Sequence, residues 1–170
     1  MSSSWRRGKG CIMKLTEVRA QRLTVANEII EAIASCGRHF LSMNSDCRGD
    51  LDPAARVSRF EIVKGRLWYV DKYKESRIFV HYDPRCRSGW GWRFSEGGTL
   101  LRLLQDLRDF IVTGDPVNLA FFGTFPHWLC GGDPWGYGAD MAVLRNRVEA
   151  IIAEGALVDS CPPAGHGGGE

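Results

Sequence analysis

The sequence lacks the features by which several protein classes are recognised. No stretch approaches the roughly 20 apolar residues of a membrane-spanning helix, and the Ser/Arg/Gly-rich residues 1–14 lack the apolar segment of a secretory signal. The phosphate loop Gly-x-x-x-x-Gly-Lys-Ser/Thr is missing, as is any motif around Cys86 or Cys130 typical of a nucleophilic cysteine enzyme. These absences predict no membrane contact and favour a protein without catalytic activity.

Closely spaced cysteine pairs are also missing. None of the six cysteines belongs to a Cys-x-x-Cys pair, so we expect mostly reduced thiols in a cytoplasmic protein. Two mixed spacings, Cys36-x-x-His39 and His127-x-x-Cys130, offer the nitrogen and sulfur ligands that zinc prefers. With four histidines and six cysteines such pairs arise by chance, so we predict neither a metal nor another cofactor. Whether the two pairs converge stays open.

The composition is that of an ordinary globular protein, but charged residues are distributed unevenly along the chain. Its 170 residues fit one domain, and 44% of them are apolar. Residues 58–93 hold nine basic and four acidic residues, whereas residues 94–170 hold four basic and ten acidic ones. We therefore expect a polarised domain with a basic sheet region and an acidic helical end, and the basic region can attract phosphates.

Helical periodicity appears three times. Apolar residues recur at helical spacing from Val18 to Ile33, from Leu100 to Ile111 and from Met141 to Ile152. Glycines 37, 114 and 155 are the expected ends of these helices. We expect residues 1–13 to be a flexible extension, 14–157 a single domain and 158–170 a disordered tail, with Met13 as an alternative start of translation.

Three short strands are expected between the first two helices. Phe60 and Ile62 alternate with Glu61, Lys64-Gly65 is a tight turn, and residues 66–73 and 77–82 are rich in aromatic and β-branched types. The order α-β-β-β-α-α predicts an α+β fold, with a three-stranded antiparallel sheet and about three helices on one face. Residues 38–57 are expected to be irregular.

An anion site is one candidate function for the start of the second long helix. Helix starts present free amide groups, glycines allow close approach to the backbone, and an arginine supplies charge. Capping by Ser95 or Thr99 explains the same pattern without a ligand. The candidate residues are Arg93, Ser95, Gly97, Gly98 and Thr99.

A second candidate is a basic, aromatic face of the sheet. Aromatic rings stack on unpaired bases while lysine and arginine hold the nucleic-acid backbone. The alternative is that the rings are packed under other elements and the charges lie at the rim. The candidate residues are Arg66, Trp68, Lys72, Arg77, Phe79 and His81.

The aromatic, Gly/Pro-rich loops form a third candidate. Dense aromatics in irregular segments form either a small core or a surface for a partner, where aromatics are common anchors. The candidate residues for contact with a partner are Trp90, Trp92, Trp128, Trp135 and Tyr137.

Two blocks in these regions carry a resemblance to known proteins. The segments Phe94-Ser95-Glu96-Gly97-Gly98-Thr99-Leu100 and Asp133-Pro134-Trp135-Gly136-Tyr137-Gly138 resemble those of uncharacterised proteins from proteobacterial phages, prophages and plasmids. The resemblance implies an accessory role in a mobile element and no site residues. The resulting hypothesis is a non-catalytic binding module that contacts a host protein or complex. The alternatives are a nucleic-acid-binding protein and a small nucleotide-binding protein or enzyme.

Overall fold

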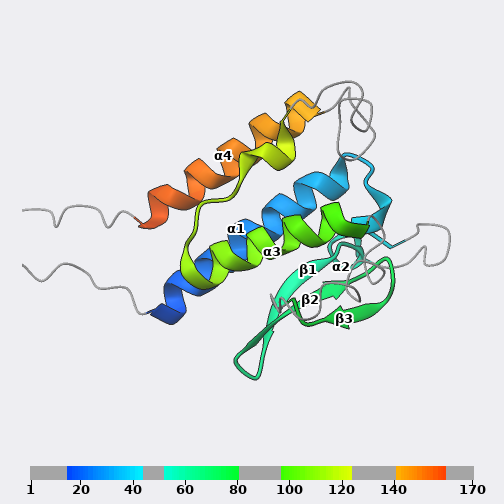
Figure 1. Cartoon of the computed structure of the whole chain (residues 1–170), viewed down its shortest axis with the longest axis horizontal. Coiled ribbons are helices and arrows are strands. Elements are labelled where there is room, and N and C mark those ends of the chain that lie inside the picture. The colour runs from blue at the N-terminus through cyan, green and yellow to red at the C-terminus, as the bar shows by residue number, and fades with distance from the viewer. Residues whose placement is uncertain (1–14, 44–51, 81–96, 124–140, 160–170) are drawn as a thin grey trace, which may run out of the picture.

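The computed structural model describes residues 15–43, 52–80, 97–123 and 141–159, and it has the α+β architecture expected from the sequence (Figure 1). Its described part holds a three-stranded sheet and four α-helices, the second of which is a single turn. The long helices lie on one side of the sheet (Figure 1). None of the described helices combines the length and apolarity needed to cross a bilayer.

The sheet is an antiparallel meander of β1 (Arg59–Val63), β2 (Arg66–Asp71) and β3 (Ser76–Ile78), in that spatial order. The β1–β2 turn contains Lys64 and Gly65 with φ values of 51° and 74°, as a two-residue hairpin with the right twist requires. The register places Phe60 opposite Tyr69 and Tyr69 opposite Ile78. These three side chains are buried and form the inner face of the sheet.

Helix α1 (Leu15–Ser35) lies at the centre of the fold and contacts α3, α4 and β1. Its buried positions cover more than one side of the helix because it packs against elements on both sides. The sequence encodes this with consecutive apolar pairs, and Gly37 follows the helix with a φ of 83°, confirming the expected end. The completely buried residues of α1 are Ala26, Ile29, Ile30 and Ile33.

Helix α3 (Gly97–Thr113) carries the expected apolar stripe, and Gly114 follows it with a φ of 87°. The Gly114 N–H donates to the carbonyl of Phe110, which is typical of a helix end. A Cβ at Gly114 would lie 2.5 Å from Nη2 of Arg22, so the guanidinium of α1 occupies the space beside this glycine. The buried residues of the stripe are Leu100, Leu103, Leu104, Leu107 and Ile111.

The expected end of the last helix at Gly155 is wrong. Helix α4 runs from Met141 to Asp159 and passes through Gly155. A Cβ at this position would lie 2.5 Å from Cγ2 of Val25 on α1, and the Gly155 carbonyl accepts a hydrogen bond from the side chain of Gln21 at 3.2 Å. The glycine therefore serves close helix packing and does not end the helix.

Other boundaries also differ from the sequence expectation. The segment expected to be irregular contains η1 (His39–Leu41) and α2 (Pro53–Arg56), the latter capped by the Asp52 side chain. Strand β2 ends at Asp71 because the Asp71 carboxylate accepts from the Lys74 N–H at 2.9 Å and starts a turn. Helix α3 begins at Gly97, so Thr99 lies inside its first turn and is not its cap. The short helix η5 (Leu119–Phe122) contacts α4.

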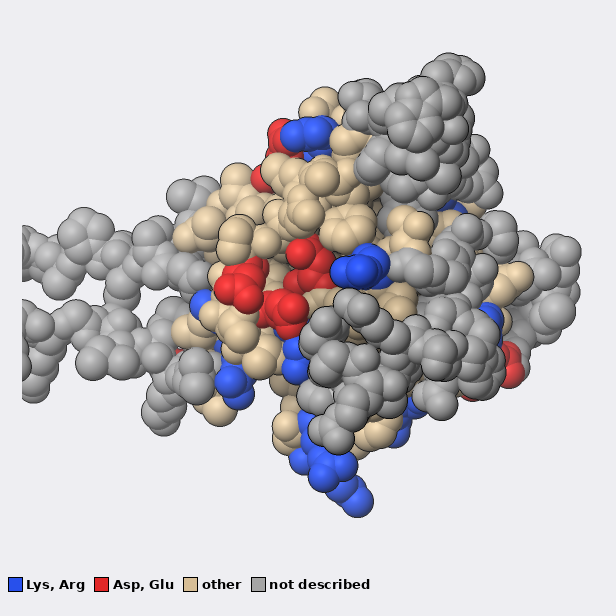
Figure 2. All heavy atoms as spheres, viewed as in Figure 1, with Lys and Arg blue, Asp and Glu red and all other residues tan. Residues whose placement is uncertain are grey.

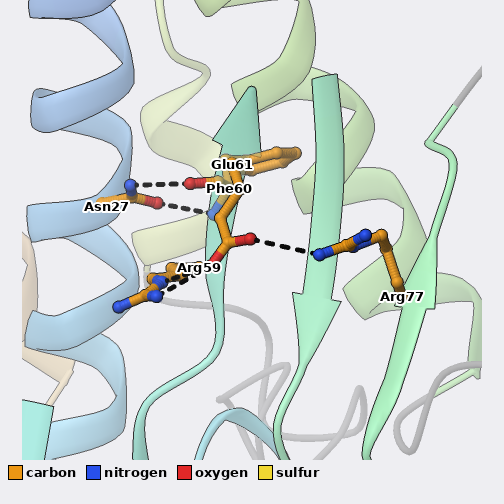
Figure 3. A network of polar contacts seen from close by, with 5 residues as sticks. All are labelled: Asn27, Arg59, Phe60, Glu61 and Arg77. Carbon is orange, nitrogen blue, oxygen red and sulfur yellow. Dashed lines mark hydrogen bonds and ion pairs between the residues drawn. The ribbon is translucent and has the colours of Figure 1, made fainter. Parts of the chain in front are cut away.

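One asparagine fixes α1 to the edge of the sheet (Figure 3). The Asn27 amide donates to the Phe60 carbonyl at 3.1 Å and accepts from the Phe60 N–H at 2.7 Å. Both groups of Phe60 are on the unpaired edge of β1, which would otherwise be left to water or to another strand. The side chain thus completes the hydrogen bonding of an edge strand and sets the position of the sheet under α1.

Candidate binding surface on the sheet

The outer face of the sheet carries an aromatic pair. Residues of β2 alternate between the faces, so Trp68 and Val70 lie opposite to buried Tyr69. The register places Trp68 beside Glu61 and Val70 beside Arg77. The rings of Trp68 and Phe79 are 5.3 Å apart at 59°, a tilted contact that favours both rings. The Phe79 side chain is still 40% exposed.

Two arginines flank Glu61 on this face (Figure 3). Nη2 of Arg59 lies 2.8 Å from Oε1 of Glu61, and Nη2 of Arg77 lies 3.6 Å from Oε2. Both arginine side chains are about half exposed, so each pair contributes on the order of 0.2–1 kcal/mol. Glu61 orients two cations across the strands, and the group keeps a net charge of +1. We call the set Arg59, Glu61, Trp68, Val70, Arg77 and Phe79 the outer sheet surface.

The structure brings together only part of the nucleic-acid candidate set. Trp68, Arg77 and Phe79 share the outer sheet surface, as expected. Arg66 is exposed at the beginning of β2, and Lys72 lies in the β2–β3 turn with its N–H bonded to Ser58 Oγ at 2.9 Å. His81 lies outside the described residues. Sequence reasoning missed Arg59 and Glu61, although their alternation with buried Phe60 places them on the same side of β1.

Few of the residues in the other two candidate sets lie in the part of the chain that the structure describes. Of the anion set, Gly97, Gly98 and Thr99 form the first turn of α3, whereas Arg93 and Ser95 lie outside the described residues. The partner-surface residues Trp90, Trp92, Trp128, Trp135 and Tyr137 all lie outside them. Cys36 is a free thiol that packs against the core. His127 and Cys130 lie outside the described residues, so whether the two Cys/His pairs converge is not tested. Within the described ranges, no three acidic, histidine or cysteine residues are grouped as metal ligands.

A groove of about 270 Å³ lies where the β1–β2 hairpin meets α1 and α3. Three arginines from different elements line it: Arg19 from α1, Arg66 from β2 and Arg108 from α3. We call it the arginine groove. Sequence reasoning did not find it because its cations come from segments that are far apart in the chain. Its apolar walls are formed by Ile62, Leu67, Phe79, Val80, Ile111 and Val112.

Acidic side chains gather elsewhere on the molecule. A second hollow of about 370 Å³ between α1 and α4 is lined by three exposed glutamates, Glu28, Glu31 and Glu154, together with one exposed arginine, Arg147. On α3, burial raises the pKa of Asp106, and the charges of Asp109 and Asp115 raise it further. The hydrogen bond that the Asp106 carboxylate accepts from the Asn118 N–H lowers this pKa. Figure 2 shows red side chains over this region and blue ones at the lower end, over the hairpin. In this view the acidic and basic side chains are partly separated, although blue side chains also lie beside red ones over the helices.

A buried polar group lies under the β2–β3 turn. Asp71 is completely buried, and its carboxylate accepts from the Lys74 N–H. Burial raises the pKa of Asp71, while the hydrogen bond and charge of Lys74 lower it. Burial also raises the pKa of Tyr69, against its hydrogen bond with Ser58. These groups are enclosed beneath the sheet and hold the turn, so we assign them a structural role.

Comparison with known proteins identifies a family for most of the chain. No curated protein and no solved structure matches the chain. The model of the YoqU family matches residues 16–150, a range that contains the sheet, α3, the arginine groove and all of α1 except Leu15. Because this range covers most of the 170 residues, the chain belongs to the YoqU family.

Proposed function

We propose that this protein is a non-catalytic binding module of the cytoplasm, encoded by a phage or plasmid, and that it contacts a host protein or complex through the outer sheet surface. The observation that carries the proposal is the aromatic side chain of Phe79, which is 40% exposed although its ring contacts that of Trp68 on this surface. Among the described residues, two further exposed hydrophobic residues lie in the sheet region but outside this surface: Tyr73 follows β2, and Ile62 lies on the face of β1 that carries Phe60. The family match and the resemblance to phage and plasmid proteins support the accessory role.

The surroundings of these residues also support a contact surface. Trp68 and Phe79 form a preformed aromatic pair, and aromatics with arginine are the residues that most often anchor interfaces. Arg59 and Arg77 are held beside the pair by Glu61, so little side-chain entropy is lost when a partner binds them. An apolar centre with a polar rim is the usual organisation of a binding surface.

The test is capture of partners from a bacterial host lysate, with and without nuclease. We expect nuclease-resistant capture by the wild type and its loss in Trp68→Ser/Phe79→Ser. Val143→Ser is the matched control, because Val143 is exposed on α4, away from the sheet. Equal capture by the double variant and the control, with both folded, would contradict the proposal.

A second candidate function is binding of single-stranded nucleic acid, favoured by one observation. The Trp68–Phe79 pair lies next to Arg77, and aromatic rings beside cations stack on bases. Against it, Glu61 already pairs with Arg59 and Arg77, and its carboxylate repels phosphates. Binding of an oligo(dT) strand that weakens steeply with salt and is lost in Trp68→Ser/Phe79→Ser would favour this function over a protein partner.

A further inference from the structure

The arginine groove has a strongly one-sided charge. Three guanidinium groups line it, and none of the lining residues within the described part of the chain is acidic. Arg19 and Arg66 make no ion pair with a carboxylate in that part, and Arg108 pairs only with its neighbour Asp109, whose side chain is 46% exposed. The described residues therefore give the groove a positive potential, and among them only Asp109 offsets part of it.

One of these arginines also has an unused hydrogen-bond donor. The Nε atom of Arg19 is buried and has no hydrogen-bond partner among the described residues. A buried donor without a partner is costly, and none of the described residues offsets that cost. Guanidinium groups bind carboxylates with paired hydrogen bonds, which adds geometric selectivity to the charge attraction.

The walls of the groove restrict the ligand further. They are mostly aliphatic, and two of their residues remain open to solvent, with Ile62 47% and Phe79 40% exposed. The volume of about 270 Å³ lies just below the roughly 300–1,000 Å³ of pockets that enclose small molecules. An aliphatic wall fits an apolar side chain better than a base, which needs a flat ring for stacking.

We infer that the arginine groove binds an acidic segment of a protein partner, in which an apolar side chain is flanked by glutamates or aspartates. The apolar side chain contacts Ile62, Phe79 and the α3 wall, and the carboxylates pair with Arg19 and Arg66. The inference rests on the proposed function, and it adds the chemistry of the partner. Phe79 links the outer sheet surface to the arginine groove, because it contacts Trp68 on that surface and also lines the groove.

The test uses the full chain labelled with ¹⁵N and a short synthetic peptide with a central Leu-Phe pair flanked by glutamates. We expect saturable shifts of the backbone amides of Gly65, Leu67, Val80 and Val112, which line the groove. Arg19→Gln/Arg66→Gln should bind the peptide about tenfold more weakly, because two charge-assisted contacts are lost. Arg102→Gln is the control, since Arg102 is exposed on the same helix as Arg108 and does not line the groove; its affinity should be unchanged.

Two peptide variants separate charge from apolar contact. Replacing the glutamates by glutamines, or the Leu-Phe pair by serines, should each weaken binding about tenfold. Equal binding of the glutamine peptide, shifts confined to other amides, or stronger groove shifts with oligo(dT) would overturn the inference. Trp68→Ser separates it from the proposed function, because Trp68 does not line the groove. If Trp68→Ser abolishes lysate capture while the peptide leaves the groove amides unshifted, the binding module stands and the acidic ligand is wrong.

Discussion

The two faces of the sheet carry similar residues in different surroundings. On the inner face, Phe60 and Tyr69 pack with ring centroids 5.7 Å apart and are no more than 1% exposed. On the outer face, Trp68 and Phe79 make a contact of nearly the same geometry, yet Phe79 is 40% exposed. The inner pair is covered by the helical layer that contains α1. Aromatic content alone therefore does not distinguish core from contact surface, and coverage by another element does.

Truncation of one ring on each face tests this comparison most strongly. Phe60→Ala should lower the free energy of unfolding by about 3–5 kcal/mol, because it leaves a cavity beneath α1. Phe79→Ala should cost about 1 kcal/mol or less, as for most surface changes. Thermal denaturation followed by circular dichroism measures both, and similar losses in the two variants would mean that the faces do not differ.

Removing the hydrogen bonds that attach β1 to α1 should lower the free energy of unfolding by less than Phe60→Ala does. Asn27→Ala removes both hydrogen bonds to the backbone of Phe60 and should cost about 1–3 kcal/mol. Asn27→Asp is the matched control, because it keeps the acceptor for the Phe60 N–H but loses the donor, so its loss should be intermediate. Hydrogen exchange of the Phe60 amide should accelerate in the same order. Unchanged exchange in Asn27→Ala would show that this contact does not hold the edge of the sheet.

The tightness of the helical layer can be tested at Gly155. Gly155→Ala brings a methyl group against Val25, which should cost about 1–3 kcal/mol, and roughly 1 kcal/mol is regained from helix propensity. In a Val25→Ala background the same change should be neutral or stabilising. A double-mutant cycle measured by urea denaturation checks this, and strict additivity would contradict the packing explanation.

The smallest effect concerns the charge of Asp71 and its dependence on pH. The pKa of Asp71 in the folded state is raised above 3.8, mainly by burial. The folded protein therefore favours the protonated carboxyl, and the stability that this preference contributes is fully present below about pH 3.8 and is lost as the pH rises through the folded-state pKa. Asp71→Asn keeps an oxygen for the Lys74 N–H and removes the buried charge. We expect the melting temperature of the wild type to decrease relative to that of Asp71→Asn by a few degrees between about pH 4 and pH 7, measured by calorimetry. Parallel pH profiles would show that Asp71 carries no such penalty.

The elements that were predicted well are those whose signals are local. The apolar stripe of α3 needs only one helix to be recognised, and Gly37, Gly65 and Gly114 have positive φ values that few residues other than glycine adopt. Gly155 was misinterpreted because its reason lies on another helix, in Val25. Thr99 and the ends of β2 and β3 were misplaced because several neighbouring residues were equally able to cap or turn the chain.

The outer sheet surface was predicted in part, because part of its pattern is local to single strands. Alternation in β2 and in residues 77–79 was enough to group Trp68, Arg77 and Phe79, and it also separates Trp68 from Tyr69. It did not show which of the two faces the helices cover. Arg19 and Arg108 were not considered as site residues, since on their own helices they look like ordinary polar positions.

The sequence by itself determined the fold class, the order of the strands along the chain, two of the three long-helix ends and a partial separation of charge, because periodicity, turn chemistry and composition act over a few residues. Only the tertiary structure decided which sheet face is covered, why a glycine lies within α4, and that Arg19, Arg66 and Arg108 line one groove. These features depend on contacts between segments far apart in the chain, and no local pattern records such contacts.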